Sequence, residues 1–190
     1  RSGSMAGDKM DQVKAAALQI VESLDQSDSF NIIDYGTTVT SLFQKPQGVG
    51  QVTPDAARQY LAGLRPNGGT NIHDGLLEAL RADQCNLGTP ILLFLTDGIP
   101  TVGRTSEREI RELVDSGNTF QRRIFTFGVG TDVNAPLLDR ISDISRGYTT
   151  YVLPGEDIEV AVAGVAKRLS GPTLTDIEFS GARDLHTDNP

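Results

Sequence analysis

Three short loops of this chain carry the oxygen ligands that a small divalent cation prefers. Ser2 and Ser4 stand near the start, Thr70 follows two glycines, and Asp97 follows an apolar run. Mg²⁺ takes oxygen ligands in octahedral geometry and usually retains several waters. One carboxylate and three neutral hydroxyls neutralise only part of its charge, so an open position would attract a carboxylate from outside. The pattern therefore predicts a cation site formed by Ser2, Ser4, Thr70 and Asp97.

The segments that would position these loops alternate between strand and helix patterns. Apolar residues at three- and four-residue spacing, with capping residues, predict helices at 8–24, 53–64, 71–82, 106–115, 135–145 and 157–169. Apolar or alternating runs predict strands at 30–35, 38–43, 91–95, 123–129 and 148–153. This alternation indicates a doubly wound α/β fold, with a mostly parallel sheet, helices on both faces and one antiparallel edge strand at 38–43.

The Ser2–Ser4 loop lacks the strand that should come before it. In doubly wound folds, ligands collect at the carboxyl ends of the central strands. Asp97 follows the strand at 91–95, but no strand pattern precedes Arg1. An empty central position would leave the backbone groups of two neighbouring strands without ladder partners. We therefore expect the sequence to be part of a longer chain, with an apolar strand immediately upstream of Arg1 that ends in an acidic residue.

Other polar residues near these loops have simpler interpretations. Asp34 lies in a predicted strand and is expected to face solvent rather than the site. His73 is expected at the surface or packed in a loop, because no second set of ligands with zinc spacing accompanies it. Asp139 and Asp143 fit a solvated helix face. Arg1, beside the first loop, is expected to contact a bound partner.

Composition excludes several classes of function. The formal net charge of −8 and the lack of a Lys/Arg run argue against a nucleic-acid partner, which needs a clustered basic face. The single cysteine, Cys85, cannot form an internal disulfide. The longest apolar run, 91–95, is too short to span a bilayer, so no transmembrane segment is expected in this chain.

As a set, the motifs resemble the von Willebrand factor A domain. The matching stretches are Arg1-Ser2-Gly3-Ser4-Met5, Gly69-Thr70-Asn71 and Leu95-Thr96-Asp97-Gly98. The metal site of that family is an Asp-x-Ser-x-Ser loop with a distant Thr and a distant Asp. Ser2, Ser4, Thr70 and Asp97 match four of these positions, and the first aspartate would fall one position before Arg1. The resemblance covers residues 1 to about 170.

Within the family, the chain looks most like the inter-alpha-trypsin-inhibitor heavy-chain type and its bacterial relatives. The supporting stretches are 30–33, 125–130 and 169–177. In that subgroup more β structure follows the A domain, so residues 1–170 are expected to form the A domain and 171–190 the start of a β-rich segment. The resemblance also implies a secreted or cell-envelope protein.

The resemblance implies a non-enzymatic, metal-ion-dependent adhesion module. It would bind Mg²⁺ or Mn²⁺ rather than Ca²⁺, and a protein partner would complete the site with Asp or Glu. One alternative is a Mg²⁺-dependent phosphoryl-transfer or hydrolytic enzyme, although no P-loop, Asp-x-Asp pair or Gly-x-Ser-x-Gly elbow occurs. Another is a structural scaffold with a vestigial metal site.

Overall fold

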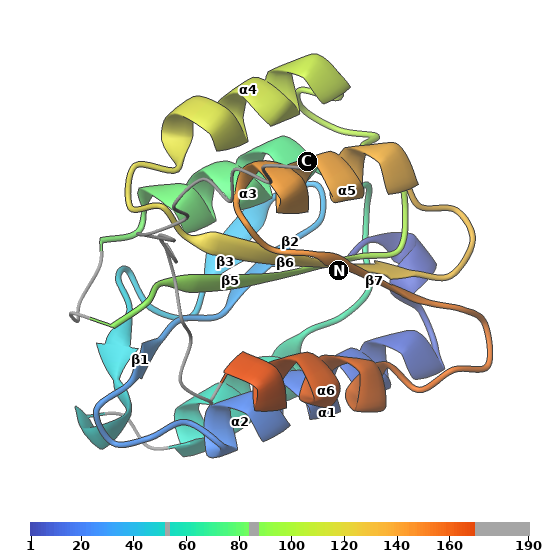
Figure 1. Ribbon diagram of the computed structural model, residues 1–190. Coiled ribbons are helices and arrows are strands. Elements are labelled where there is room, and N and C mark those ends of the chain that lie inside the picture. Colours follow the sequence, from blue (N-terminus) through green and yellow to red (C-terminus); the bar gives the residue numbers. More distant parts are fainter. Residues whose placement is uncertain (52–53, 84–87, 170–190) are drawn as a thin grey trace, which may run out of the picture.

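A parallel sheet lies at the centre of the molecule, with helices on both of its faces (Figure 1). The computed structural model describes residues 1–51, 54–83 and 88–169. The sheet has three strands in the spatial order β5 (Ile91–Thr96), β6 (Arg123–Val129) and β7 (Thr149–Val152). Both pairings are parallel, with Leu93 beside Phe125 and Phe127 beside Thr150. The predicted doubly wound α/β fold is confirmed.

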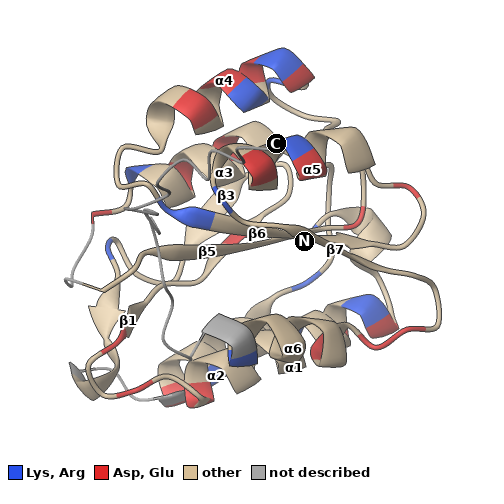
Figure 2. Cartoon of the chain, in the orientation of Figure 1, with Lys and Arg blue, Asp and Glu red and all other residues tan. Residues whose placement is uncertain are grey.

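Two layers of helices enclose this sheet (Figure 1). One layer consists of α1 (Asp8–Glu22), α2 (Pro54–Gly63) and α6 (Ile158–Leu169). The other consists of α3 (Ile72–Arg81), α4 (Glu107–Gly117) and α5 (Ala135–Ile144). Side-chain caps from Asn71, Ser106 and Asn134 begin the helices of the second layer. Charged residues are mainly on the helices and loops, whereas the central strands are largely uncharged (Figure 2).

Two clusters of buried hydrophobic residues lie on the two faces of the sheet. Strand β6 contributes to both clusters, because its successive side chains point to opposite faces of the sheet. Ile124 belongs to the cluster under α3, α4 and α5. Phe125, Phe127 and Val129 belong to the cluster under α1 and α6. All four side chains are buried, as expected for a strand of a parallel sheet that helices cover on both faces.

The first half of the chain departs from the prediction in detail. The expected strand at 30–35 is divided into β1 (Ser29–Phe30) and β2 (Ile33–Tyr35). Asn31 causes the break, because its side-chain oxygen accepts from the backbone N–H groups of Ile32 and Phe43. Strand β3 (Val39–Ser41) pairs antiparallel with β2, as predicted for the edge strand.

The segment between the strand expected at 38–43 and the helix expected at 53–64 also contains regular structure. It contains β4 (Gln47–Gly48), which pairs with β1, and the short 3₁₀ helix η2 (Val49–Gln51). Thr53, Cys85 and the segment 170–190 lie outside the described residues, so the expected β-rich segment stays a prediction. Within the described ranges, no helix combines the length and apolar character needed to cross a bilayer.

A cavity of about 810 Å³ lies between β2 and β5. Its walls include Ile33 of β2, Val13 of α1 and Leu93 of β5. The continuous apolar run of β5 predicts a strand buried on both faces, but only Phe94 and Thr96 are buried along it. Strand β5 is less buried than predicted because it pairs with β6 on one edge and faces this cavity on the other.

Candidate metal centre

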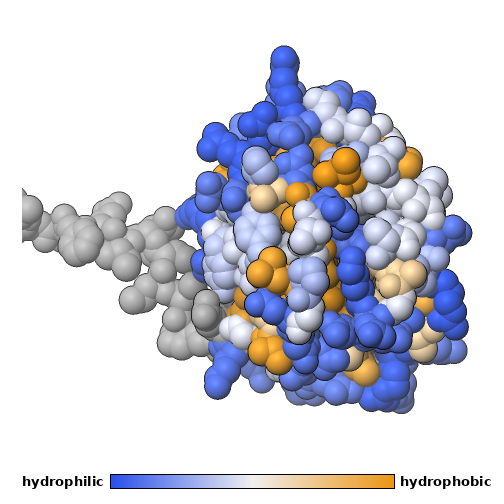
Figure 3. All heavy atoms as spheres, turned by 90° about the vertical axis from the view of Figure 1, so that its right-hand side faces the viewer, coloured by the Kyte–Doolittle hydropathy of each residue, from blue (hydrophilic) through white to orange (hydrophobic). Residues whose placement is uncertain are grey.

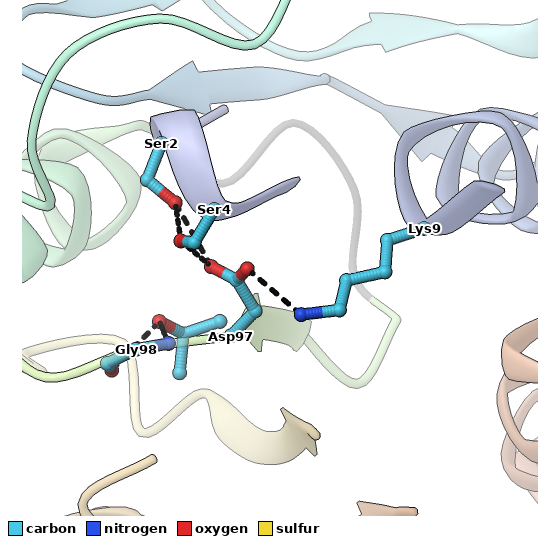
Figure 4. A network of polar contacts seen from close by, with 6 residues as sticks. Ser2, Ser4, Lys9, Asp97 and Gly98 are labelled. Atoms are coloured by element: carbon cyan, nitrogen blue, oxygen red, sulfur yellow. Dashed lines mark hydrogen bonds and ion pairs between the residues drawn. The ribbon is translucent and has the colours of Figure 1, made fainter. Parts of the chain in front are cut away.

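Oxygens from two loops converge at the carboxyl end of β5. The 3₁₀ turn η1 (Gly3–Met5) follows Ser2 and presents both serines to Asp97. Ser2 Oγ and Ser4 Oγ each donate a hydrogen bond of 2.8 Å to Asp97 Oδ1, and the two hydroxyl oxygens are 2.9 Å apart (Figure 4). Ser2 and Asp97 are buried, whereas Ser4 is exposed. Three of the predicted ligands therefore form one compact triangle of oxygens.

Thr70, the remaining predicted ligand, sits on the loop before α3. It is buried and lines the same cavity as Ser2 and Asp97. Its Oγ1 lies 3.8 Å from the position that a Cβ would take on Gly98, the residue after Asp97. The structure thus places Thr70 beside the triangle. Two hydrogen bonds to Thr101 hold its loop in position. Thr70 N donates to Thr101 Oγ1 at 2.8 Å, and Thr101 N donates to Thr70 O at 2.9 Å.

The loop before Thr70 also holds the serine turn in place. Gly3 N donates to Gly68 O at 2.9 Å, which ties η1 to this loop. Gly68 has a φ of +74°, in the left-handed region, and a Cβ there would lie 2.2 Å from Thr37 Oγ1. Thr37 Oγ1 in turn accepts a hydrogen bond of 3.0 Å from Gly69 N. Only glycine fits this position without strain.

We expect Gly68→Ala to lower the free energy of unfolding by about 1–3 kcal/mol, the usual cost of a residue held in a sparsely populated backbone region. It should also weaken cation binding, because the serine turn is anchored to this residue. Urea unfolding measures the first effect. Gly63→Ala is the matched control, since a Cβ at that helical position meets nothing within 4 Å. Equal stability of the two variants would contradict the prediction.

Lys9 contacts the second oxygen of the Asp97 carboxylate. It extends from the first turn of α1, and its Nζ lies 3.4 Å from Asp97 Oδ2 (Figure 4). The side chain of Asp97 is 1% exposed and that of Lys9 is 40% exposed. Lys9 was not among the site residues predicted from the sequence. Its position in the helix turn that follows the two serines was the available signal.

Tyr35 closes one end of the cavity between β2 and β5. Its hydroxyl donates a hydrogen bond of 2.7 Å to the carbonyl oxygen of Leu95, and its ring stacks on Phe94 with centroids 5.3 Å apart. Burial raises the pKa of this phenol, so the hydroxyl stays protonated and acts as a donor at neutral pH. The contact from β2 to β5 across the cavity is therefore made by the side chain of Tyr35.

Asp34 does not face solvent as predicted, but is buried. Its carboxylate pairs with the guanidinium of Arg1 and accepts a hydrogen bond of 2.7 Å from the Tyr60 hydroxyl. Arg1 is thus directed at Asp34, and its expected contact with a partner stays a prediction. The burial of Asp34 depends on this long-range ion pair, which residue spacing does not reveal.

His73 is a buried residue packed at the start of α3, consistent with the loop-packing alternative rather than the surface one. Its Nδ1 lies 2.8 Å from Asp74 Oδ1. The hydrogen bond with His73, followed by that from Asn71, lowers the pKa of Asp74. Asp139 and Asp143 lie on the exposed face of α5, as predicted. In the described part of the chain, no group of three or more His, Cys, Asp or Glu side chains could hold a metal ion, so the hydroxyl-rich triangle is a different kind of donor set.

The chain is similar to a known family of domains over most of its length. The family profile described as the von Willebrand factor type A domain matches residues 1–151. The human inter-alpha-trypsin inhibitor heavy chain H4 is 29% identical over 187 residues, which is 94% of this chain and 20% of that protein. This chain therefore spans about a fifth of the length of the curated relatives that it matches.

Solved structures have the same fold. A von Willebrand factor type A protein from Catenulispora acidiphila superposes with a TM-score of 0.75 at 20% identity, covering 88% of this chain and 39% of that one. Proximal thread matrix protein 1 from the mussel byssus, solved with a zinc-occupied MIDAS motif, gives a TM-score of 0.68 at 20% identity, covering 88% and 43%.

Proposed function

The chain belongs to the von Willebrand factor type A domain family, and we propose that it is a protein-binding module that recognises its partner through a divalent cation. Ser2, Ser4, Thr70 and Asp97 would hold the cation, which acts as a Lewis acid that accepts a carboxylate oxygen from an Asp or Glu of the partner. The zinc-occupied motif of the mussel protein, and the relationship to inter-alpha-trypsin inhibitor heavy chains, support this proposal.

The shape of the oxygen triangle is the observation that carries the proposal. Its sides are 2.8, 2.8 and 2.9 Å, between Ser2 Oγ, Ser4 Oγ and Asp97 Oδ1. In an octahedral Mg²⁺ site with metal–oxygen distances of about 2.0–2.1 Å, adjacent ligand oxygens lie about 2.9 Å apart. Ca²⁺, with distances of about 2.3–2.6 Å, would need oxygens more than about 3.2 Å apart. The triangle is therefore compatible with an octahedral Mg²⁺ site, and Mn²⁺ accepts the same oxygen donors.

The charge of the donor set explains why the partner should be acidic. Asp97 is the one carboxylate among the four proposed ligands, so a divalent ion bound there keeps a net positive charge. The surrounding face, seen in Figure 3, is mostly hydrophilic with separated hydrophobic clusters. Ile99, two residues after Asp97, is 54% exposed and could add an apolar contact beside the acidic group. We further propose a secreted or cell-envelope location, following the similarity to the heavy chains.

Thermal melts test the cation site. A ligand that binds only the folded state stabilises it by about 2.7 kcal/mol at 100 times its Kd, which corresponds to about 5–11 °C for a chain of this length. We expect such a shift with Mg²⁺ and Mn²⁺ but a smaller one with Ca²⁺, all relative to EDTA. Melting temperatures that are the same in EDTA and in saturating Mg²⁺ or Mn²⁺ would contradict the proposal.

Water proton relaxation tests the open coordination position. Mn²⁺ bound to the protein should enhance the relaxation rate of water through its coordinated waters. Acetate, which stands in for an Asp or Glu side chain, should reduce this enhancement, and acetamide at the same concentration should not. An equal response to both would argue against carboxylate recognition. Hydrolysis of a phosphate ester that needs the cation and disappears in Asp97→Asn would instead favour the enzymatic alternative.

A further inference from the structure

Lys9 occupies an unusual place for a basic residue. It lies in the first turn of α1, where the helix dipole disfavours a positive charge. Its ammonium nevertheless reaches Asp97 Oδ2 at 3.4 Å, on the opposite side of the carboxylate from the two serines (Figure 4). A Cβ placed on Gly130, which follows β6, would lie 3.5 Å from Nζ. The ammonium is thus placed between the ends of β5 and β6.

The two oxygens of Asp97 have different partners. Oδ1 accepts from Ser2 and Ser4, and Oδ2 faces Lys9. The carboxylate is almost fully buried, so its negative charge needs compensation inside the protein. The serine hydroxyls provide hydrogen bonds without charge, whereas Lys9 provides a positive charge.

We propose that Lys9 is an exchangeable counter-ion that sets the affinity of the cation site. This inference rests on the proposed function, because it concerns the same Asp97. The ammonium neutralises Asp97 while no divalent cation is bound. A divalent cation on Asp97 repels the nearby ammonium, which must then move away from the carboxylate. The side chain of Lys9 is 40% exposed and has a flexible four-carbon stem, so it can turn toward solvent.

The proposal predicts opposite effects on the metal-free and metal-bound forms. Lys9→Met keeps most of the apolar stem and suits a helix, but it removes the charge. Without the cation, this variant should melt at a lower temperature than the wild type in EDTA, because Asp97 loses its counter-ion. Its affinity for Mn²⁺ should rise on the order of tenfold, because the repulsion disappears. Lys9→Arg keeps the positive charge and should not bind Mn²⁺ more tightly than the wild type.

Calorimetric titration with Mn²⁺ tests the inference. Lys14→Met is the matched control, because it removes the same charge from the same helix, more than one turn beyond Lys9. We expect the control to stay within about twofold of the wild type. Binding by the wild type that Lys9→Met does not tighten would overturn this inference alone. If neither the wild type nor Lys9→Met bound Mn²⁺, the proposed function would be overturned, and this inference with it.

Discussion

Replacing Asp97 with asparagine is expected to reduce the affinity for Mg²⁺ and Mn²⁺ by at least about 100-fold. Asparagine retains the shape of the side chain, but its neutral amide cannot compensate a divalent charge. A loss of two factors of ten in affinity corresponds to about 2.8 kcal/mol, well within the electrostatic attraction between a buried carboxylate and a divalent ion. Isothermal titration calorimetry with MnCl₂ measures the change directly.

Two further variants make this result specific. Asp97→Ala should lose cation binding as well and should also lose the hydrogen bonds from Ser2 and Ser4. Asp143→Asn removes an equal charge from an exposed position of α5 and should leave the affinity unchanged. If Asp97→Asn bound Mn²⁺ as tightly as the wild type, the cation would have to bind elsewhere.

The second large effect concerns the cavity between β2 and β5. We propose that a strand added directly before Arg1, parallel to β5, would fill this cavity. Arg1 and Ser2 line the cavity together with Asp97, at the carboxyl end of β5. A strand that runs parallel to β5 and fills the space would therefore reach its last residue beside Arg1. Its backbone could pair with the edge of β5 that faces the cavity.

An extension of six apolar and β-branched residues ending in aspartate, placed directly before Arg1, tests this proposal. Each apolar side chain that becomes buried contributes about 1.5–3 kcal/mol, offset in part by the entropy of ordering the added residues. We expect a net stabilisation of about 3 kcal/mol, or about 6–12 °C in Tm. An extension of equal length made of serine, glycine and threonine, also ending in aspartate, is the control for chain length.

The last residue of the extension separates the strand from the metal site. An apolar extension that ends in asparagine should stabilise the fold equally in EDTA. It should bind Mn²⁺ less tightly than the version that ends in aspartate, because the second carboxylate is missing. If the apolar and the polar extensions gave the same melting temperature, the cavity would not be a strand position.

The sequence predicted the elements with strong periodic patterns. Helices α1, α3 and α4 and strands β5 and β6 lie within a few residues of the expected ranges. Their apolar spacing reflects burial, and local caps such as Ser106 define their ends. The grouping of Ser2, Ser4 and Asp97 was also predictable, because loops at the carboxyl ends of parallel strands meet at one edge of the sheet.

The features that the sequence did not reveal depend on individual side chains that act over long distances. Asn31 interrupts a run that otherwise has a strand pattern, because it bonds to the backbone of Phe43. Asp34 is buried because Arg1 and Tyr60 supply its partners. Lys9 reaches Asp97 across 88 positions of sequence. Hydrophobic periodicity and secondary-structure propensity carry no information about such long-range side-chain pairs.

A crystal structure grown with Mn²⁺ tests the central claim most directly, because the ion is located by its anomalous scattering. We predict one strong peak within bonding distance of Ser2 Oγ, Ser4 Oγ and an oxygen of Asp97, with Thr70 directly or through water at a further position. The Lys9 ammonium should have left Asp97 in the same crystal. A peak at another place on the protein, or no peak at saturating Mn²⁺, would contradict the account.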